Sequence, residues 1–132
     1  MADSRKILIA DDEPQLALAI KIRLQSKGYQ VVTASDGQAA LALAGQERPD
    51  LIILDVLMPV MDGYSCLREL NTRFGRGTFP VIILTARDRM KDLFELEGIE
   101  DYVIKPFDHE DLLLRIERVL KRRAAKAPVS PP

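Results

Sequence analysis

Four short runs of branched apolar residues in this chain each end directly at a chemically active side chain. The runs cover residues 7–10, 51–54, 81–84 and 102–104. They are followed in turn by Asp11 with Asp12, by Asp55, by Thr85 and by Lys105. Continuous apolar runs of this length are typical of strands buried on both faces of a parallel sheet. Because ligands bind beyond the carboxyl ends of such strands, the pattern predicts one site that combines carboxylates, a hydroxyl and an ammonium group.

Helical stretches alternate with the predicted strands. A further strand is expected over residues 30–34, and helices are expected to begin near Pro14, Gly37, Gly63, Asp88 and Asp108. The helix over 88–97 is predicted to be short and highly charged. Alternation of this kind indicates βαβ units with right-handed crossovers. We therefore expect an α/β fold, a doubly wound five-stranded parallel sheet in a single domain.

Bulk properties narrow the class of protein. The length of 132 residues suits one domain, and the net charge of −1 gives no general attraction to nucleic acid or to anionic membranes. No apolar run approaches the roughly 20 residues that span a bilayer, and residues 1–6 lack the features of a signal peptide. Cys66 is the only cysteine, which fits a reducing cytoplasm. We expect a cytoplasmic domain over 1–124, without direct binding to nucleic acid or membrane, and a flexible tail or linker stub over 125–132.

The predicted cluster of carboxylates is electrostatically costly. At 4 Å and an effective dielectric constant of 20, each pair of carboxylates repels by roughly 4 kcal/mol. A bound cation relieves this repulsion, and a few oxygen ligands with room for water and phosphate favour Mg²⁺ over a caged Ca²⁺. A metal, a lysine and a hydroxyl beside a carboxylate are the components of phosphoryl transfer. Asp55 is the best candidate nucleophile, because its strand is expected in the middle of the sheet.

The residues that carry this chemistry match a known family. The chain resembles the receiver domain of bacterial response regulators, the two-component signalling proteins, from residue 5 to about 123. The matching motifs are Asp11-Asp12-Glu13, Asp55-Val56-Leu57-Met58-Pro59, Met61-Asp62-Gly63, Thr85-Ala86 and Lys105-Pro106-Phe107. Their order and spacing together are highly specific. The resemblance implies a flavodoxin-like sheet with the strand order 2-1-3-4-5.

The resemblance also implies how the site is used. Asp55 would accept a phosphoryl group from a sensor histidine kinase or a phosphotransfer protein. Mg²⁺, with Mn²⁺ as a substitute, would be held by Asp12, Asp55 and the backbone carbonyl of Leu57, with Asp11 assisting directly or through water. Thr85 and Lys105 would hold the phosphoryl group. Such a domain is not an enzyme in the usual sense, because it catalyses only its own phosphorylation and dephosphorylation.

Switching residues follow from the same resemblance. Thr85 would move toward the phosphoryl group, and Tyr102 would turn inward into the space that is left. The face formed by the fourth helix, the fifth strand and the fifth helix would change, and would control an output partner, dimerisation or an attached effector domain. Pro106 is expected to follow a cis peptide bond, as is usual in the family.

One segment departs from the family pattern. Lys105 follows Thr85 by 20 positions, one or two fewer than is usual, so the fourth helix should be short, shifted or poorly ordered. Some features are similar to the winged-helix subclass. That subclass pairs acids with bases across a symmetric dimer, at positions that match Glu100, Asp101, Arg115 and Arg122. A homodimer formed on phosphorylation is therefore a hypothesis.

Simpler explanations remain for each motif taken alone. An acidic pair can end a strand, a threonine can be structural, a lysine can be a solvated charge, and Tyr102 can be ordinary strand packing. His109, the only histidine, is expected to be exposed at the start of the last helix.

Two other functions are alternatives to a phosphorylated receiver. The first is a hydrolase of the haloacid dehalogenase type, which would need a second aspartate where this chain has Leu57. A degenerate receiver that binds a partner without being phosphorylated is the second alternative. Arg87, two positions after Thr85, is predicted to shield an acyl phosphate from water.

Overall fold

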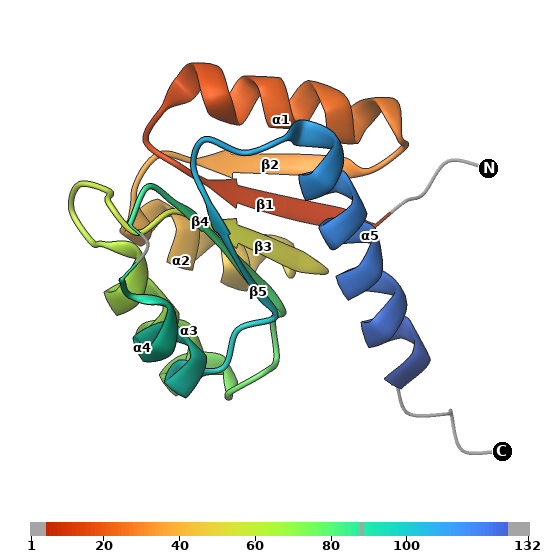
Figure 1. Cartoon of the computed structure of the whole chain (residues 1–132). Helices are drawn as coiled ribbons and strands as arrows, with labels where there is room; N and C mark the ends of the chain where they lie inside the picture. The colour runs from red at the N-terminus through yellow and green to blue at the C-terminus, as the bar shows by residue number, and fades with distance from the viewer. Residues whose placement is uncertain (1–4, 88, 127–132) are drawn as a thin grey trace, which may run out of the picture.

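The computed structural model describes residues 5–87 and 89–126 and contains a parallel sheet with helices on both faces (Figure 1). The strands are β1 (Lys6–Ala10), β2 (Gln30–Ala34), β3 (Leu51–Leu54), β4 (Val81–Thr85) and β5 (Asp101–Ile104). The helices are α1 (Pro14–Ser26), α2 (Gly37–Glu47), α3 (Gly63–Phe74), α4 (Lys91–Glu97) and α5 (His109–Lys126). The strands lie in the order β2-β1-β3-β4-β5 and pair in parallel, which confirms the predicted fold.

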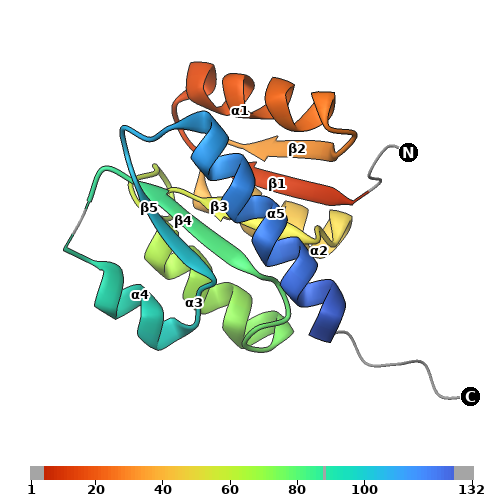
Figure 2. The same ribbon diagram turned by 45° about the vertical axis from the view of Figure 1, so that its right-hand side comes forward.

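Two apolar layers separate the sheet from its helices. Alternate residues of the strands point to opposite faces, so Ile7 and Ile9 join one layer while Leu8 and Ala10 join the other. The first layer is completed by α1 and α5, and the second by α2, α3 and α4. Figure 2 shows α5 crossing one face of the sheet while α3 and α4 lie on the other. With both faces covered, the central strands are buried throughout, which explains their unbroken apolar runs.

Local signals in the sequence explain where several helices begin and end. Pro14 occupies the first turn of α1, where its missing N–H removes no helical hydrogen bond. The carboxylates of Asp36 and Asp62 accept hydrogen bonds from Ala39 N and Ser65 N, and so cap α2 and α3. Gly28, with φ of 94°, follows α1 in the left-handed region that favours glycine.

The structure changes the predicted bounds at two places. Helix α4 has seven residues and begins at Lys91, three positions later than predicted, with Asp88 outside the described residues. Its N-cap, Met90, makes no side-chain capping bond. Helix α5 continues to Lys126, so the first two residues of the predicted tail over 125–132 are helical, and 127–132 lie outside the described residues. Within the described ranges, no helix combines the length and apolar character that a bilayer crossing requires.

Candidate functional site

The carboxyl ends of the central strands bring the predicted site residues together. Asp55 N donates to Ala10 O at 2.9 Å, and Lys105 N donates to Thr85 O at 2.8 Å. The parallel pairing therefore continues to the residues just beyond β3 and β5. Asp11, Asp55 and Thr85 are buried. Carboxylates are rarely buried unless they are paired, so the two aspartates need a partner of opposite charge. The predicted convergence at one edge of the sheet is present.

Three carboxylates form the acidic part of the site. Oxygen atoms of Asp11, Asp12 and Asp55 all lie within 4.8 Å of one another, and Asp12 is the exposed member. Backbone amides fix two of these groups: Val56 N donates to Asp55 Oδ1 at 2.7 Å, and Glu13 N donates to Asp11 Oδ1 at 2.9 Å. Oxygen donors at this spacing, open to solvent on the Asp12 side, suit a hard divalent cation that keeps part of its water shell.

Lys105 joins three acids from one position. Its Nζ lies 2.9 Å from Asp11 Oδ2, 3.3 Å from Asp55 Oδ2 and 3.1 Å from Glu13 Oε1. The first two contacts place the Lys105 ammonium group at the predicted site. The contact with Glu13 was not predicted, although Glu13 directly follows the acidic pair in the sequence. A lysine in this place neutralises part of the carboxylate charge and presents an ammonium group to any anion that approaches Asp55.

Burial and neighbouring charges shift the protonation equilibria of the site. Burial of Asp55 raises the pKa of its carboxyl group, as does the nearby charge of Asp11, while Lys105 and the Val56 amide lower that pKa by less. Burial lowers the pKa of Lys105, but its bonds to Asp11, Asp55 and Glu13 outweigh burial and leave the pKa raised. A second cation would therefore be favourable beside Asp55.

Thr85 and Tyr102 are linked through the backbone of Arg87. Arg87 N donates to Thr85 Oγ1 at 3.3 Å, and the Tyr102 hydroxyl donates to the Arg87 carbonyl. The Tyr102 ring is buried and lies 6.0 Å from the ring of Phe94 in α4. Thr85 at the end of β4 and Tyr102 on β5 thus both contact the loop between β4 and α4, and the Tyr102 side chain points inward.

The loop between β3 and α3 holds Asp55 by tight packing. Gly63 N donates to Val56 O at 2.8 Å, and a Cβ atom on Gly63 would lie 2.0 Å from the Asp55 carbonyl oxygen. Gly37 makes an equally close approach to Met61 O of the same loop. The side chain of Leu57, whose backbone carbonyl is a predicted metal ligand, is half exposed in this loop. The loop therefore leaves no room for side chains at either glycine.

A cavity lies beside Lys105 at the edge of the site. The Lys105–Pro106 peptide bond is cis, as predicted. The cavity of about 470 Å³ is lined by Glu13, Leu16, Ala86, Lys105, Pro106, Phe107 and His109. His109 is half-buried rather than exposed, because its ring packs 4.9 Å from that of Phe107. The prediction of a solvent-exposed histidine is therefore wrong. Burial and the charge of Arg23 lower the pKa of His109.

The four residues predicted to pair across a dimer form two ion pairs within the chain. Arg115 Nη1 lies 2.8 Å from Asp101 Oδ1, and Arg122 Nη2 lies 3.2 Å from Glu100 Oε2. Both pairs join α5 to the region of β5, on the predicted output face. The acids and bases are therefore adjacent on one surface, and a dimer would have to exchange or share these partners.

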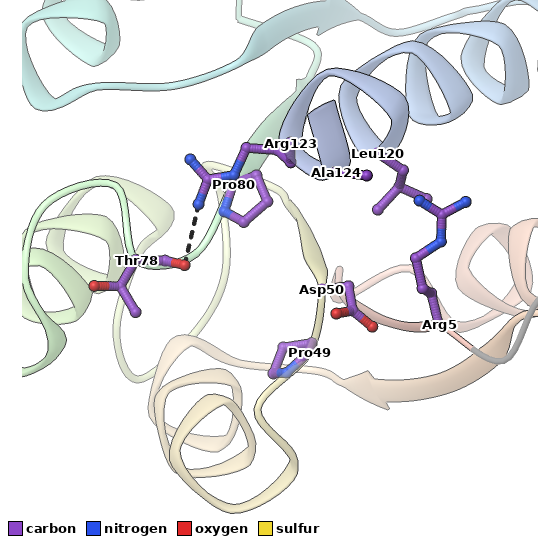
Figure 3. A pocket seen from close by; sticks show the side chains of 8 residues that line it. All are labelled: Arg5, Pro49, Asp50, Thr78, Pro80, Leu120, Arg123 and Ala124. Carbon is purple, nitrogen blue, oxygen red and sulfur yellow. Dashed lines mark hydrogen bonds between the residues drawn. The ribbon is translucent and has the colours of Figure 1, made fainter. Parts of the chain in front are cut away.

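A second pocket lies at the amino ends of the strands, opposite the candidate site (Figure 3). It has a volume of about 300 Å³ and is lined by Arg5, Pro49, Asp50, Thr78, Pro80, Leu120, Arg123 and Ala124. Arg123 donates to the carbonyl oxygens of Gly77 and Thr78, and Asp50 accepts from Lys6 N at 2.8 Å. The Arg123 bonds fasten α5 to the segment before β4, and the Asp50 bond joins the amino ends of β1 and β3, at the opposite ends of the strands from Asp55.

Comparison with known proteins gives consistent matches over nearly the whole chain. A family model of the response regulator receiver domain matches residues 7–117. The alkaline phosphatase synthesis transcriptional regulatory protein PhoP of Bacillus subtilis (strain 168) is 40% identical over 129 residues, which are 96% of this chain and 53% of PhoP. The chain spans about half the length of the curated relatives it matches.

Solved structures match as well. The signal receiver domain of a putative LuxO repressor protein from Vibrio parahaemolyticus has a TM-score of 0.89 and 26% identity, covering 98% of this chain and 100% of that domain. The receiver domain of the sensor histidine kinase PA1611 from Pseudomonas aeruginosa PAO1 has a TM-score of 0.80 and 34% identity, covering 90% and 99%. That structure has a magnesium ion coordinated in its active site cleft.

Proposed function

The chain belongs to the response regulator receiver domain family, and from that premise we propose that it accepts a phosphoryl group on Asp55 from a sensor histidine kinase or a phosphotransfer protein. The observation that carries the proposal is the position of Asp55 Oδ2 beside Lys105, within a cluster of three carboxylates and near the buried Thr85. A hydrolase of the haloacid dehalogenase type is not favoured, because Leu57 stands where its acid–base aspartate is required.

Mg²⁺ fits the donor set of this site. Asp11, Asp12 and Asp55 would hold it together with the backbone carbonyl of Leu57, and Mn²⁺ would substitute because it accepts the same oxygen ligands. The related receiver domain of PA1611, which carries magnesium in its cleft, supports this assignment. When bound, the ion supplies charge neutralisation for the carboxylates and for the phosphoryl oxygens.

The two oxygens of Asp55 have different surroundings, which suggests how the reaction proceeds. Oδ1 is fixed by the Val56 amide, whereas Oδ2 faces Lys105. Oδ2 attacks the phosphorus atom, a phosphorus–oxygen bond forms, and the bond from phosphorus to the donor nitrogen breaks. The donor nitrogen keeps the electron pair and takes up a proton. Lys105 stabilises the phosphoryl oxygens, and the Thr85 hydroxyl donates to one of them.

Phosphorylation would act on the output face through Thr85. The Thr85 hydroxyl accepts a hydrogen bond from the Arg87 amide, and the Arg87 carbonyl accepts one from the Tyr102 hydroxyl. A phosphoryl group that draws Thr85 toward Asp55 changes this loop, and with it α4 and β5. The domain is then a two-state element biased by one charged modification. Its catalysis extends only to its own phosphorylation and dephosphorylation.

We propose dimerisation through α4, β5 and α5 as one output of the switch, beside an output partner or an attached effector domain. The Arg115–Asp101 and Arg122–Glu100 pairs are partly exposed, so each contributes only about 0–1 kcal/mol and can exchange partners at little cost. Phosphorylated protein, or protein loaded with beryllofluoride, should sediment as a dimer, and Arg115→Ala should weaken that dimer. A monomer at high concentration in both cases would remove dimerisation from the proposal.

Intact mass spectrometry tests the phosphoacceptor function. After incubation with Mg²⁺ and acetyl phosphate, the wild-type chain should gain the mass of one phosphoryl group, whereas Asp55→Asn should not. Replacing Mg²⁺ by EDTA should abolish the gain. If the wild type gains nothing, even with several histidine kinases as donors, the chain is a degenerate receiver that works by binding alone.

A further inference from the structure

Glu13 is the third carboxylate on the ammonium group of Lys105. Nζ lies 3.1 Å from Glu13 Oε1, a distance between those to Asp11 and Asp55. An ammonium group has three N–H donors, and here each one has a carboxylate acceptor. Lys105 must therefore release at least one acid before it can donate to a phosphoryl group on Asp55.

Glu13 differs from the other two acids in its surroundings. Its side chain is 60% exposed, whereas those of Asp11 and Asp55 are 2% and 5% exposed. Backbone amides hold both aspartates in place. Among the described residues, Lys105 is the one group that the carboxylate of Glu13 binds. Glu13 is thus a peripheral acid whose contact at the site is with Lys105.

We infer that Glu13 is a positioning residue that competes with the phosphoryl group for Lys105 and so slows the phosphorylation of Asp55. This inference rests on the proposed function. In that reaction Asp11 serves the metal and Asp55 carries the phosphoryl group, so neither remains a full competitor for the ammonium group. Glu13 has neither role and stays available to Lys105 throughout. The level of phosphorylation by small-molecule donors is then set partly by Glu13.

The rate of phosphorylation tests the competition. Initial rates are measured by intact mass at saturating Mg²⁺ for the wild type, Glu13→Gln and Glu117→Gln. Glu117, on α5, is the control because its loss changes the net charge equally without touching Lys105. Glu13→Gln should raise the rate about two- to fivefold, the effect of losing one exposed ion pair. Glu117→Gln should match the wild type.

Two phosphodonors separate competition for Lys105 from a general effect of charge. Acetyl phosphate is a dianion at neutral pH and phosphoramidate is a monoanion, so a general effect would favour the first. Competition for Lys105 predicts the same increase with both donors. An increase with acetyl phosphate alone, an unchanged rate or a slower rate would each overturn the inference. If the wild type itself is not phosphorylated, the proposed function fails together with this inference.

A titration of Lys105 gives a readout that a purely structural role would not move. The Cε resonance of Lys105, assigned by its loss in Lys105→Arg, is followed by NMR against pH in metal-free buffer. Glu13→Gln should lower the pKa of Lys105, because one carboxylate that favours the ammonium form is gone. Glu117→Gln should leave that pKa unchanged. An unchanged pKa in Glu13→Gln would show that the contact is absent in solution and would contradict the inference.

Discussion

Lys105 Nζ lies 3.3 Å from Asp55 Oδ2, although 50 positions separate the two residues in the sequence. The parallel pairing of β3, β4 and β5 produces this contact, since the two residues directly follow β3 and β5. The same ammonium group also meets Asp11, which follows β1. A single lysine thus balances carboxylates from two strands, and the stability and the chemistry of the site both depend on it.

Lys105→Met should destabilise the metal-free protein. The buried carboxylates of Asp11 and Asp55 lose their common cation, which costs about 1–3 kcal/mol in the free energy of unfolding. Added Mg²⁺ should recover much of this loss, because it supplies positive charge to the same carboxylates. Urea denaturation with EDTA and with Mg²⁺ measures both effects. Lys91→Met, which removes an exposed partner of Glu95, should change stability by less than about 0.5 kcal/mol. Equal losses in the two variants would contradict the role assigned to Lys105.

Asp55→Asn should stabilise the metal-free protein near neutral pH. Burial and the charge of Asp11 raise the pKa of Asp55, so its carboxylate form is less favourable in the folded than in the unfolded chain. The contribution of this group to stability is fully present at low pH and is lost as the pH rises through the folded pKa. The difference between variant and wild type should therefore shrink as the pH falls. Denaturation curves in EDTA at several pH values check this, and a difference that grows at low pH would show the opposite shift.

Arg87→Ala should shorten the lifetime of the phosphorylated state. The contacts of Arg87 with Thr85 and Tyr102 use its backbone, so the substitution removes the exposed side chain and leaves those contacts in place. If that side chain shields the acyl phosphate from water, phosphate release should become several-fold faster. The release is measured on purified phosphoprotein in Mg²⁺. Arg89→Ala, a nearby exposed arginine, is the control. An unchanged rate for Arg87→Ala would refute the shielding role.

Gly63→Ala should destabilise the protein and disturb Asp55. The new Cβ would lie 2.0 Å from the Asp55 carbonyl oxygen, so the β3–α3 loop has to move, at a cost of about 1–3 kcal/mol. Phosphorylation of Asp55 should slow as well. Gly45→Ala, within α2, is the comparison, because its Cβ would meet only the ring of Phe74 at 3.2 Å. Thermal unfolding of both variants measures the difference, and a Gly63→Ala variant as stable as the wild type would rule out the close packing.

The sequence predicted the centre of this site well because its residues are fixed by strands. Asp55, Thr85 and Lys105 each end or follow an apolar run, and strand order alone determines which of them meet. The resemblance to a known family added the strand order and the cis bond before Pro106, which composition and periodicity cannot supply.

Contacts of exposed side chains were harder to predict. Glu13 was part of a quoted motif, but its bond to Lys105 depends on the rotamers of two long side chains, which no sequence spacing specifies. The ion pairs of Arg115 and Arg122 within the chain were not predicted either, because they depend on how α5 packs beside β5. The start of α4 was also missed, because Met90 gives no capping signal.

The location of the phosphoryl group tests the central claim most directly. Protein phosphorylated in Mg²⁺ is reduced with borohydride, which converts an aspartyl phosphate to homoserine, and the modified residue is located by peptide mass spectrometry. The account predicts homoserine at position 55 in the wild type, and none when EDTA replaces Mg²⁺. Homoserine at position 11 or 12 instead, or at no position with any phosphodonor, would contradict the assignment of Asp55 as the phosphoacceptor.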